Sequence, residues 1–235
     1  MIAALLALTC VLVAPQDAPA PIRWETLPPV PDAVGFGGPF IAALEGASGE
    51  HRLLVAGGAN FPVAPPWEGG VKVWHADTWV FDGAAWTAGP PLPEPRAYGA
   101  VVHLDGRALL IGGGDSSGAT PETLIAELDA DGVVRFTAGP ALPAPSQFLS
   151  AGLVDGRVVV LGAQRSADAS DLIRATWILD PGNLASGWVE SAPFPGLAGL
   201  KSVAVPQRNA QGKEALFVYS GEVPGQEAER LSDGR

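Results

Sequence analysis

The sequence predicts an all-β fold built from repeated four-stranded units, and three observations support this prediction. A block that starts with Trp or Phe recurs 50 residues apart, as WTAGPPLP from Trp86 and FTAGPALP from Phe136, with a looser copy from Trp188. Short apolar runs that end in glycine lie between the copies. Glycine (30 residues) and proline (23) make up almost a quarter of the 235-residue chain, which indicates many turns between short strands.

Each repeat contains four predicted strands in a fixed order. The turn between the first two strands is Asp105-Gly106 in one repeat and Asp155-Gly156 in another. Such pairs favour a two-residue hairpin, because Gly and Asp tolerate positive φ. The second strands are continuous apolar runs, as expected for strands buried on both faces. They are predicted at 53–58, 108–113, 158–163 and 216–221, and the third strands at 77–82, 124–129 and 175–180.

This pattern is typical of one kind of fold, the kelch-type β-propeller, in which a blade of about 50 residues has four strands and a glycine pair after an apolar strand. The strands account for three complete blades, a fourth blade that stops after its second strand, and an isolated strand at Trp24. A blade cannot bury its own faces, so an open arc of blades is expected to be part of a closed ring. We therefore expect about three and a half blades of a ring that has six when complete. This propeller domain is predicted to span residues 21–235.

The first 20 residues are interpreted as a signal peptide. Residues 2–13 form an apolar run that is too short to span a bilayer, and Ala18-Pro19-Ala20 offers a cleavage site. The interpretation predicts a periplasmic or secreted protein without a membrane span. The one cysteine, Cys10, lies inside this run, so the mature chain would have no disulfide and a lipid-anchored N-terminus stays an alternative.

The charge of the chain bears on its partners. Lys and Arg total 14 against 25 Asp and Glu, which gives a net charge of −11. An acidic chain does not attract phosphate backbones, so a nucleic-acid partner is not expected. Solubility is sufficient to explain the acidic balance, and the sequence does not indicate an oligomeric state.

The connectivity of the strands predicts which end of the propeller carries function. In an antiparallel meander, the connections after the second and fourth strands share one end, and here they are the long ones. Long loops gathered on a rigid scaffold are where binding sites usually lie. Their polar residues suit a charged or polyhydroxylated small ligand, although each could also be a solvated loop residue. They include Asn60, Glu68, His75, Arg96, Asp115, Gln147, Arg165, Asp168, Lys201, Glu222 and Arg230.

Three runs resemble one known family. PDAVGFGGPF (31–40), LLVAGGANFP (53–62) and EPRAYGAVV (94–102) are similar to segments of the N-acetylneuraminate epimerases, which are kelch-type sialic acid mutarotases, and in particular of their cyclically permuted branch. The resemblance covers roughly residues 24–235, and PRAYG together with GGANFP is its specific part. It implies an enzyme that interconverts the anomers of N-acetylneuraminate, an acidic sugar, with no cofactor or metal expected.

The resemblance also implies site residues. The family's proton-accepting glutamate follows a strand that ends in a small residue and glycine, which LFVYSGE matches at Glu222. Its nearby arginine corresponds loosely to Arg230. Arg96 and Tyr98 of PRAYG are further expected substrate-binding residues. Asn60 is expected to bind substrate as well, from its place among the polar residues of the long connections and not from the resemblance. These residue types fit the chemistry, since ring opening needs a base for the anomeric hydroxyl proton and an Arg fork binds a carboxylate.

Two other classes of function are compatible with kelch blades. A copper oxidase of the galactose-oxidase type is also built on kelch blades, but it requires a cysteine linked to a tyrosine, and here the one cysteine lies in the predicted signal peptide. A propeller that binds carbohydrate or protein without catalysis is the main alternative, because fold does not fix function. For that class, Trp67 and Trp74 are the candidate stacking residues on the loop end, unless they pack between blades.

Overall fold

The computed structural model describes residues 24–162, 164–166, 168, 170–195, 200–219 and 221–222. The predicted signal peptide (1–20) and the predicted site residue Arg230 lie outside these residues. Within the described ranges, no helix is long and apolar enough to cross a membrane.

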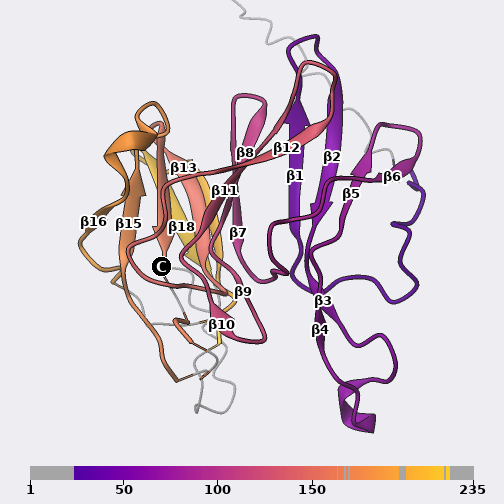
Figure 1. Ribbon diagram of the computed structural model, residues 1–235. Coiled ribbons are helices and arrows are strands. Elements are labelled where there is room, and N and C mark those ends of the chain that lie inside the picture. The colour runs from indigo at the N-terminus through magenta and orange to yellow at the C-terminus, as the bar shows by residue number, and fades with distance from the viewer. Residues whose placement is uncertain are drawn as a thin grey trace, which may run out of the picture.

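Four antiparallel sheets contain most of the strands, and each keeps the order of the chain (Figure 1). The first sheet has β1 (Phe40–Glu45), β2 (His51–Ala56), β5 (Thr78–Phe81) and β6 (Trp86–Ala88). The second has β7 (Ala100–Leu104), β8 (Arg107–Ile111), β11 (Thr123–Leu128) and β12 (Val134–Ala138). The third has β13 (Ser150–Val154), β14 (Arg157–Leu161), β15 (Thr176–Leu179) and β16 (Val189–Ser191). The fourth sheet is the hairpin of β17 (Val203–Arg208) and β18 (Glu214–Tyr219).

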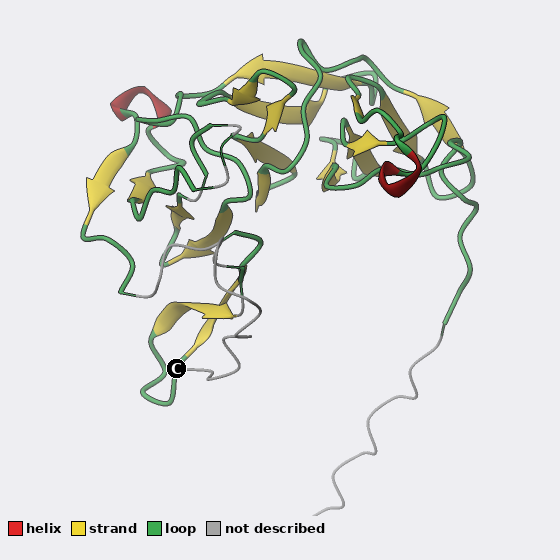
Figure 2. Cartoon of the chain, turned by 90° about the horizontal axis from the view of Figure 1, so that it is seen from below, coloured by secondary structure: helices red, strands yellow, loops and turns green. Residues whose placement is uncertain are grey.

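The sheets follow one another around an arc (Figure 2). Their first strands are neighbours, since β1 contacts β7, β7 contacts β13 and β13 contacts β17. These strands are therefore the innermost of each sheet, while β6, β12 and β16 form the outer edges. The predicted fold is confirmed: the chain is a partial kelch-type β-propeller, and its described residues form three full blades and half of a fourth. The number of blades in a complete ring stays a prediction.

The core lies between the blades, and β8 shows why the second strands are apolar throughout. Alternate side chains of a strand point to opposite faces. Leu110 packs with Phe40 in the cluster between the first and second blades. Its neighbour Leu109 packs with Val158 and Trp177 in the cluster between the second and third. The prediction of burial on both faces is confirmed for β8 and wrong for β18, which is half-buried because, in the described part of the chain, a blade lies against one of its faces only.

The predicted turn chemistry is confirmed. Asp105-Gly106 and Asp155-Gly156 have positive φ at both positions, as a type I′ turn requires. The glycine pairs join neighbouring blades: the N–H of Gly58 donates to the carbonyl of Arg96 (2.8 Å), and that of Gly113 to the carbonyl of Ser146 (2.9 Å). A Cβ atom on Gly57 would lie 2.2 Å from the Arg96 carbonyl oxygen, so glycine permits the close approach of two blades.

The recurring tryptophans fasten the blades to the proline-rich segments. The indole N–H of Trp86 donates to the Pro28 carbonyl and that of Trp188 to the Pro140 carbonyl, both at 2.8 Å. The strand predicted at Trp24 is wrong. Residues 24–30 form no strand, and Trp24 itself is 88% exposed, because no neighbouring strand pairs with this segment in the described structure.

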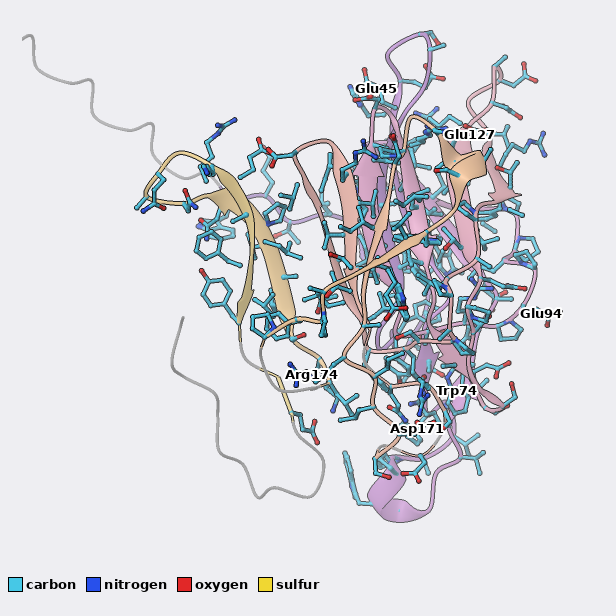
Figure 3. The ribbon with its side chains drawn as sticks, turned by 90° about the vertical axis from the view of Figure 1, so that its left-hand side faces the viewer. Glu45, Trp74, Glu94, Glu127, Asp171 and Arg174 are labelled. Atoms are coloured by element: carbon cyan, nitrogen blue, oxygen red, sulfur yellow. The ribbon has the colours of Figure 1, made fainter. Side chains whose placement is uncertain are left out.

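The two ends of the propeller differ as the connectivity predicted. One end has the short turns and includes Glu45 and Glu127 (Figure 3). The other end has the long connections, two of which fold into small hairpins (Figure 1). These hairpins are β3 (Ala59–Asn60) with β4 (Val73–Trp74), and β9 (Gly114–Asp115) with β10 (Gly118–Ala119). A one-turn 3-10 helix covers Pro66–Glu68 in the β3–β4 hairpin. Another covers Leu184–Ser186 in the β15–β16 connection, which belongs to the opposite end and is longer than the short turn predicted there. We call the end with the long connections the loop end.

Candidate functional site

The backbone just before each innermost strand has the same unusual conformation. Gly38, Tyr98, Phe148 and Lys201 each precede the first strand of a blade by two residues and have φ values of 62°, 64°, 54° and 57°. Bulky residues rarely adopt positive φ, and such strain is found at binding and catalytic sites. The repeat therefore places four equivalent side-chain positions at the loop end of the innermost strands.

The side chains at these positions contact one another across blade boundaries. The ring of Tyr98 stacks on that of Phe148, with centroids 4.5 Å apart. The ammonium of Lys201 lies 5.9 Å from the centroid of Phe148. On the opposite side of Tyr98 from Phe148, the ammonium of Lys72 lies 4.3 Å from the centroid of the Tyr98 ring and 4.8 Å from that of Trp74. Attraction between cations and ring faces holds these contacts. We call Lys72, Tyr98, Phe148, Lys201 and Glu222 the inner row.

Glu222 completes the inner row on the fourth blade. One of its carboxylate oxygens lies 2.7 Å from the Lys201 ammonium, and both side chains are nearly 60% exposed. Two hydrogen bonds between the backbones of Leu200 and Glu222, each 2.8 Å long, fix the strand positions that carry the pair. The carboxylate predicted to act as a base is therefore held beside a cation and open to solvent.

The repeat shows that this ion pair is peculiar to the fourth blade. The bridge between Leu200 and Glu222 has equivalents in the other blades. The residues equivalent to Glu222 are Ala59, Gly114 and Gln164. None of these side chains is ionisable, so the architecture of the blade does not require a carboxylate at this position.

Arg96 occupies a different environment. Its side chain is 3% exposed, and one nitrogen of its guanidinium pairs with the carboxylate of Glu122, while its Nη1 atom has no partner in the described structure. Burial lowers the pKa of Arg96, and the neighbouring Glu122 opposes that change. The backbone of Arg96 is also tied to the first blade, through the carbonyl of His75 and the N–H of Gly58. Arg96 thus fastens two blades together.

A pocket of about 350 Å³ lies next to Arg96, between residues 94–96 and the loop 114–122. Three carboxylates, those of Glu94, Asp115 and Glu122, line it together with the single guanidinium. An excess of negative charge repels an acidic ligand. The predicted role of Arg96 in substrate binding stays a prediction, and this pocket does not favour it for an acidic sugar.

Asn60 is also buried, with 7% of its surface exposed. Its amide donates to the carbonyl of Gly35 (2.9 Å), and its oxygen lies 2.8 Å from Nε2 of His75. It lies in the β3–β4 hairpin opposite Val73, the residue that follows Lys72 in the chain. Its predicted contact with substrate stays a prediction, while its hydrogen bonds show that it organises the hairpin.

The structure thus brings Tyr98 and Glu222 into one row and places Arg96 and Asn60 in the packing around it. Lys201 was expected at the loop end, but its contacts with Glu222 and Phe148 were not predicted. The contacts of Lys72 with Tyr98 and Trp74 were not predicted either. Alignment of the repeats was the available signal, since Lys201 occupies the position of Tyr98 and Phe148. Among the described residues, no cluster of three or more His, Cys, Asp or Glu side chains could hold a metal ion.

Comparison with curated proteins gives partial matches to proteins named N-acetylneuraminate epimerase. The protein from Brucella suis is 37% identical over 97 residues, which covers 37% of this chain and 25% of the relative. The Haemophilus influenzae protein is 32% identical over 121 residues (47% and 32%). The Yersinia pestis protein is 30% identical over 128 residues (47% and 31%). The matches thus span a quarter to a third of the curated relatives.

Comparison with solved structures supports the fold. The structure of YjhT superimposes with a TM-score of 0.64 at 16% sequence identity, over 86% of this chain and 66% of that chain. No protein-family model matches the sequence. The chain is therefore a partial kelch-type β-propeller related in sequence, over less than half of its length, to N-acetylneuraminate epimerases.

Proposed function

We propose that this chain carries the catalytic glutamate of a mutarotase that interconverts the anomers of N-acetylneuraminate. The observation that supports the proposal best is the exposed Glu222–Lys201 pair at the loop end, where the equivalent positions of the other blades have no carboxylate. The relatives named N-acetylneuraminate epimerase support the choice of sugar.

In the proposed reaction, Glu222 acts as the general base. Its carboxylate takes the proton of the anomeric hydroxyl, the bond between the anomeric carbon and the ring oxygen breaks, and a carbonyl forms. A general acid or a water molecule protonates the ring oxygen. Rotation about the bond to the carbonyl carbon and reversal of these steps close the ring with the other configuration. A positioned base contributes about 10²- to 10⁴-fold to such a proton transfer.

The aromatic part of the inner row gives the sugar a surface to lie on. Tyr98 and Phe148 form a stacked pair directly beside Lys201. The apolar face of a sugar ring packs well against aromatic rings, which bury a large area at little entropic cost. Export to the periplasm or outside the cell, guided by the apolar N-terminal run, is part of the proposal.

The test is exchange of the anomers of N-acetylneuraminate, followed by NMR. The protein should accelerate the exchange over buffer, and Glu222→Gln should reduce the catalysed rate about 10²- to 10⁴-fold. Glu190→Gln is the matched control, because Glu190 is an exposed carboxylate on the outer strand β16, and it should leave the rate unchanged.

Each outcome decides between functions. Acceleration that survives in Glu222→Gln would move the base to another residue. No acceleration by the unsubstituted protein, together with measurable binding of the sugar, would favour the alternative of a carbohydrate-binding propeller, for which the half-buried Tyr98–Phe148 pair would serve as the contact surface.

A further inference from the structure

The chemistry of the substrate class sets a geometric requirement for its site. In a 2-keto acid sugar such as N-acetylneuraminate, the carboxylate and the anomeric hydroxyl are attached to the same carbon. A base that takes the hydroxyl proton therefore works next to a second negative charge. Without a cation between the two carboxylates, their mutual repulsion would oppose binding.

Lys201 meets this requirement. Its ammonium lies 2.7 Å from the Glu222 carboxylate, and 58% of its side chain is exposed, so it can contact a second carboxylate without leaving the first. An ammonium has three N–H donors on a flexible stem. The arginine side chain of the described loop end that was predicted for this role, Arg96, is buried and paired with Glu122.

The backbone conformation at Lys201 determines where its side chain points. Lys201 has φ of 57°, although a lysine gains nothing by adopting the left-handed conformation. The conformation belongs to the repeat, and it directs the side chain at this position toward the equivalent side chain of the previous blade, Phe148. A lysine placed here is thereby held between an aromatic ring and the carboxylate of Glu222.

We infer that Lys201 binds the carboxylate on the anomeric carbon of the substrate and so selects 2-keto acid sugars over neutral ones. The inference rests on the proposed function and adds to it the residue that determines specificity. Glu222 and Lys201 then act on two substituents of one carbon. Phe148 and Tyr98 lie on the far side of Lys201, where the remainder of the sugar would extend.

The test compares N-acetylneuraminate with its methyl ester, which lacks one negative charge and keeps every hydroxyl. Calorimetric binding and NMR anomer exchange are measured for both sugars with the unsubstituted protein, Lys201→Met, Lys201→Arg and Lys213→Met. Lys213 is the matched control, since it is exposed at the opposite end of the same β17–β18 hairpin.

Lys201→Met should lower the affinity and the kcat/KM for the acid roughly 10- to 100-fold, the loss expected for one charged hydrogen bond. The affinity for the ester should change much less, because the ester offers no carboxylate to Lys201, whereas its exchange rate should also respond, since Lys201 holds the proposed base Glu222. Lys201→Arg should restore most of the preference for the acid, and Lys213→Met should behave as the unsubstituted protein. Rescue by arginine would show that charge, rather than folding, is the cause.

The outcomes separate this inference from the proposed function. Acceleration by the unsubstituted protein with an acid preference that Lys201→Met retains would overturn the role of Lys201 alone. Binding that prefers the acid and depends on Lys201, without any acceleration, would support the role of Lys201 and reject the mutarotase. Equal binding of acid and ester by the unsubstituted protein would overturn the inference as well.

Discussion

Two Glu-centred ion pairs lie at the loop end of the propeller, and their surroundings differ. Glu122 pairs with Arg96, whose side chain is 3% exposed and whose backbone bonds to the neighbouring blade. Glu222 pairs with Lys201, and both of these side chains are exposed. A buried guanidinium needs its partner to offset lost hydration, whereas an exposed pair contributes little to stability. The comparison teaches that the first pair serves the architecture, while the second is free to act on a ligand.

The same substitution at the two glutamates should have the largest effect and separate the two roles. Glu122→Gln leaves the buried Arg96 without a compensating charge and should destabilise the fold by about 2 kcal/mol, less than for a fully buried pair because Glu122 is half-exposed. Glu222→Gln should change stability by less than about 1 kcal/mol. Urea unfolding of both variants measures the difference, and equal losses would refute the comparison.

A second, smaller effect concerns the glycines next to the two pairs. Gly58 and Gly221 are equivalent in the repeat, and both have positive φ. A Cβ atom on Gly58 would lie 2.8 Å from Cβ of Phe36, whereas on Gly221 the nearest atom would be 3.4 Å away. Gly58→Ala should therefore cost at least about 1 kcal/mol more than Gly221→Ala, since backbone strain is common to both. The measurement is again urea unfolding; a larger loss at Gly221 would show that the fourth blade is the more tightly packed.

The smallest expected effect is a dependence of stability on pH near Arg96. The pKa of Asp115 lies below its ordinary value, chiefly because the hydroxyl of Ser117 donates to its carboxylate (2.6 Å). A lowered folded-state pKa contributes stability that is present above the unfolded value, about 3.9, and is lost as the pH falls through the folded one. Asp115→Asn should therefore be less stable than the unsubstituted protein at neutral pH by a small margin, which should vanish in acid. A margin that is constant between pH 7 and pH 2 would contradict this reasoning.

Much of the fold could be predicted because the same pattern of strands and turns recurs in each blade. The apolar runs and the Asp-Gly turns placed β2, β8, β14 and β18 and their hairpins within a few residues. The prediction was wrong for the segment at Trp24, which carries the aromatic pattern alone, without the other strands of a blade before it, and which has no partner strand in the described structure. Pairing with a distant strand depends on tertiary context, and a local pattern does not contain it.

The candidate site was less predictable for a physical reason. A Glu after a strand that ends in glycine is visible in the sequence, so Glu222 could be named. The exposure of its partner and the stacking of Tyr98 on Phe148 depend on positive φ at residues other than glycine, which composition does not indicate. Arg96 and Lys201 also differ in burial, since one side chain is buried and the other is exposed. The sequence does not show this difference, because both residues are cations in predicted loops.

The shared backbone conformation at 38, 98, 148 and 201 has a consequence for how such a protein can change. Backbone hydrogen bonds from Tyr98 to Gly38 and from Phe148 to Tyr98 hold this geometry, so the side chains can be exchanged while the scaffold stays. The exchanges are not independent, however, since a Cβ atom on Gly38 would lie 2.3 Å from the ring of Tyr98. A side chain at 38 becomes tolerable only after the tyrosine has been replaced by a smaller residue. Substitutions at these positions must therefore occur in a set order. The side chains already present limit which substitutions can be made next.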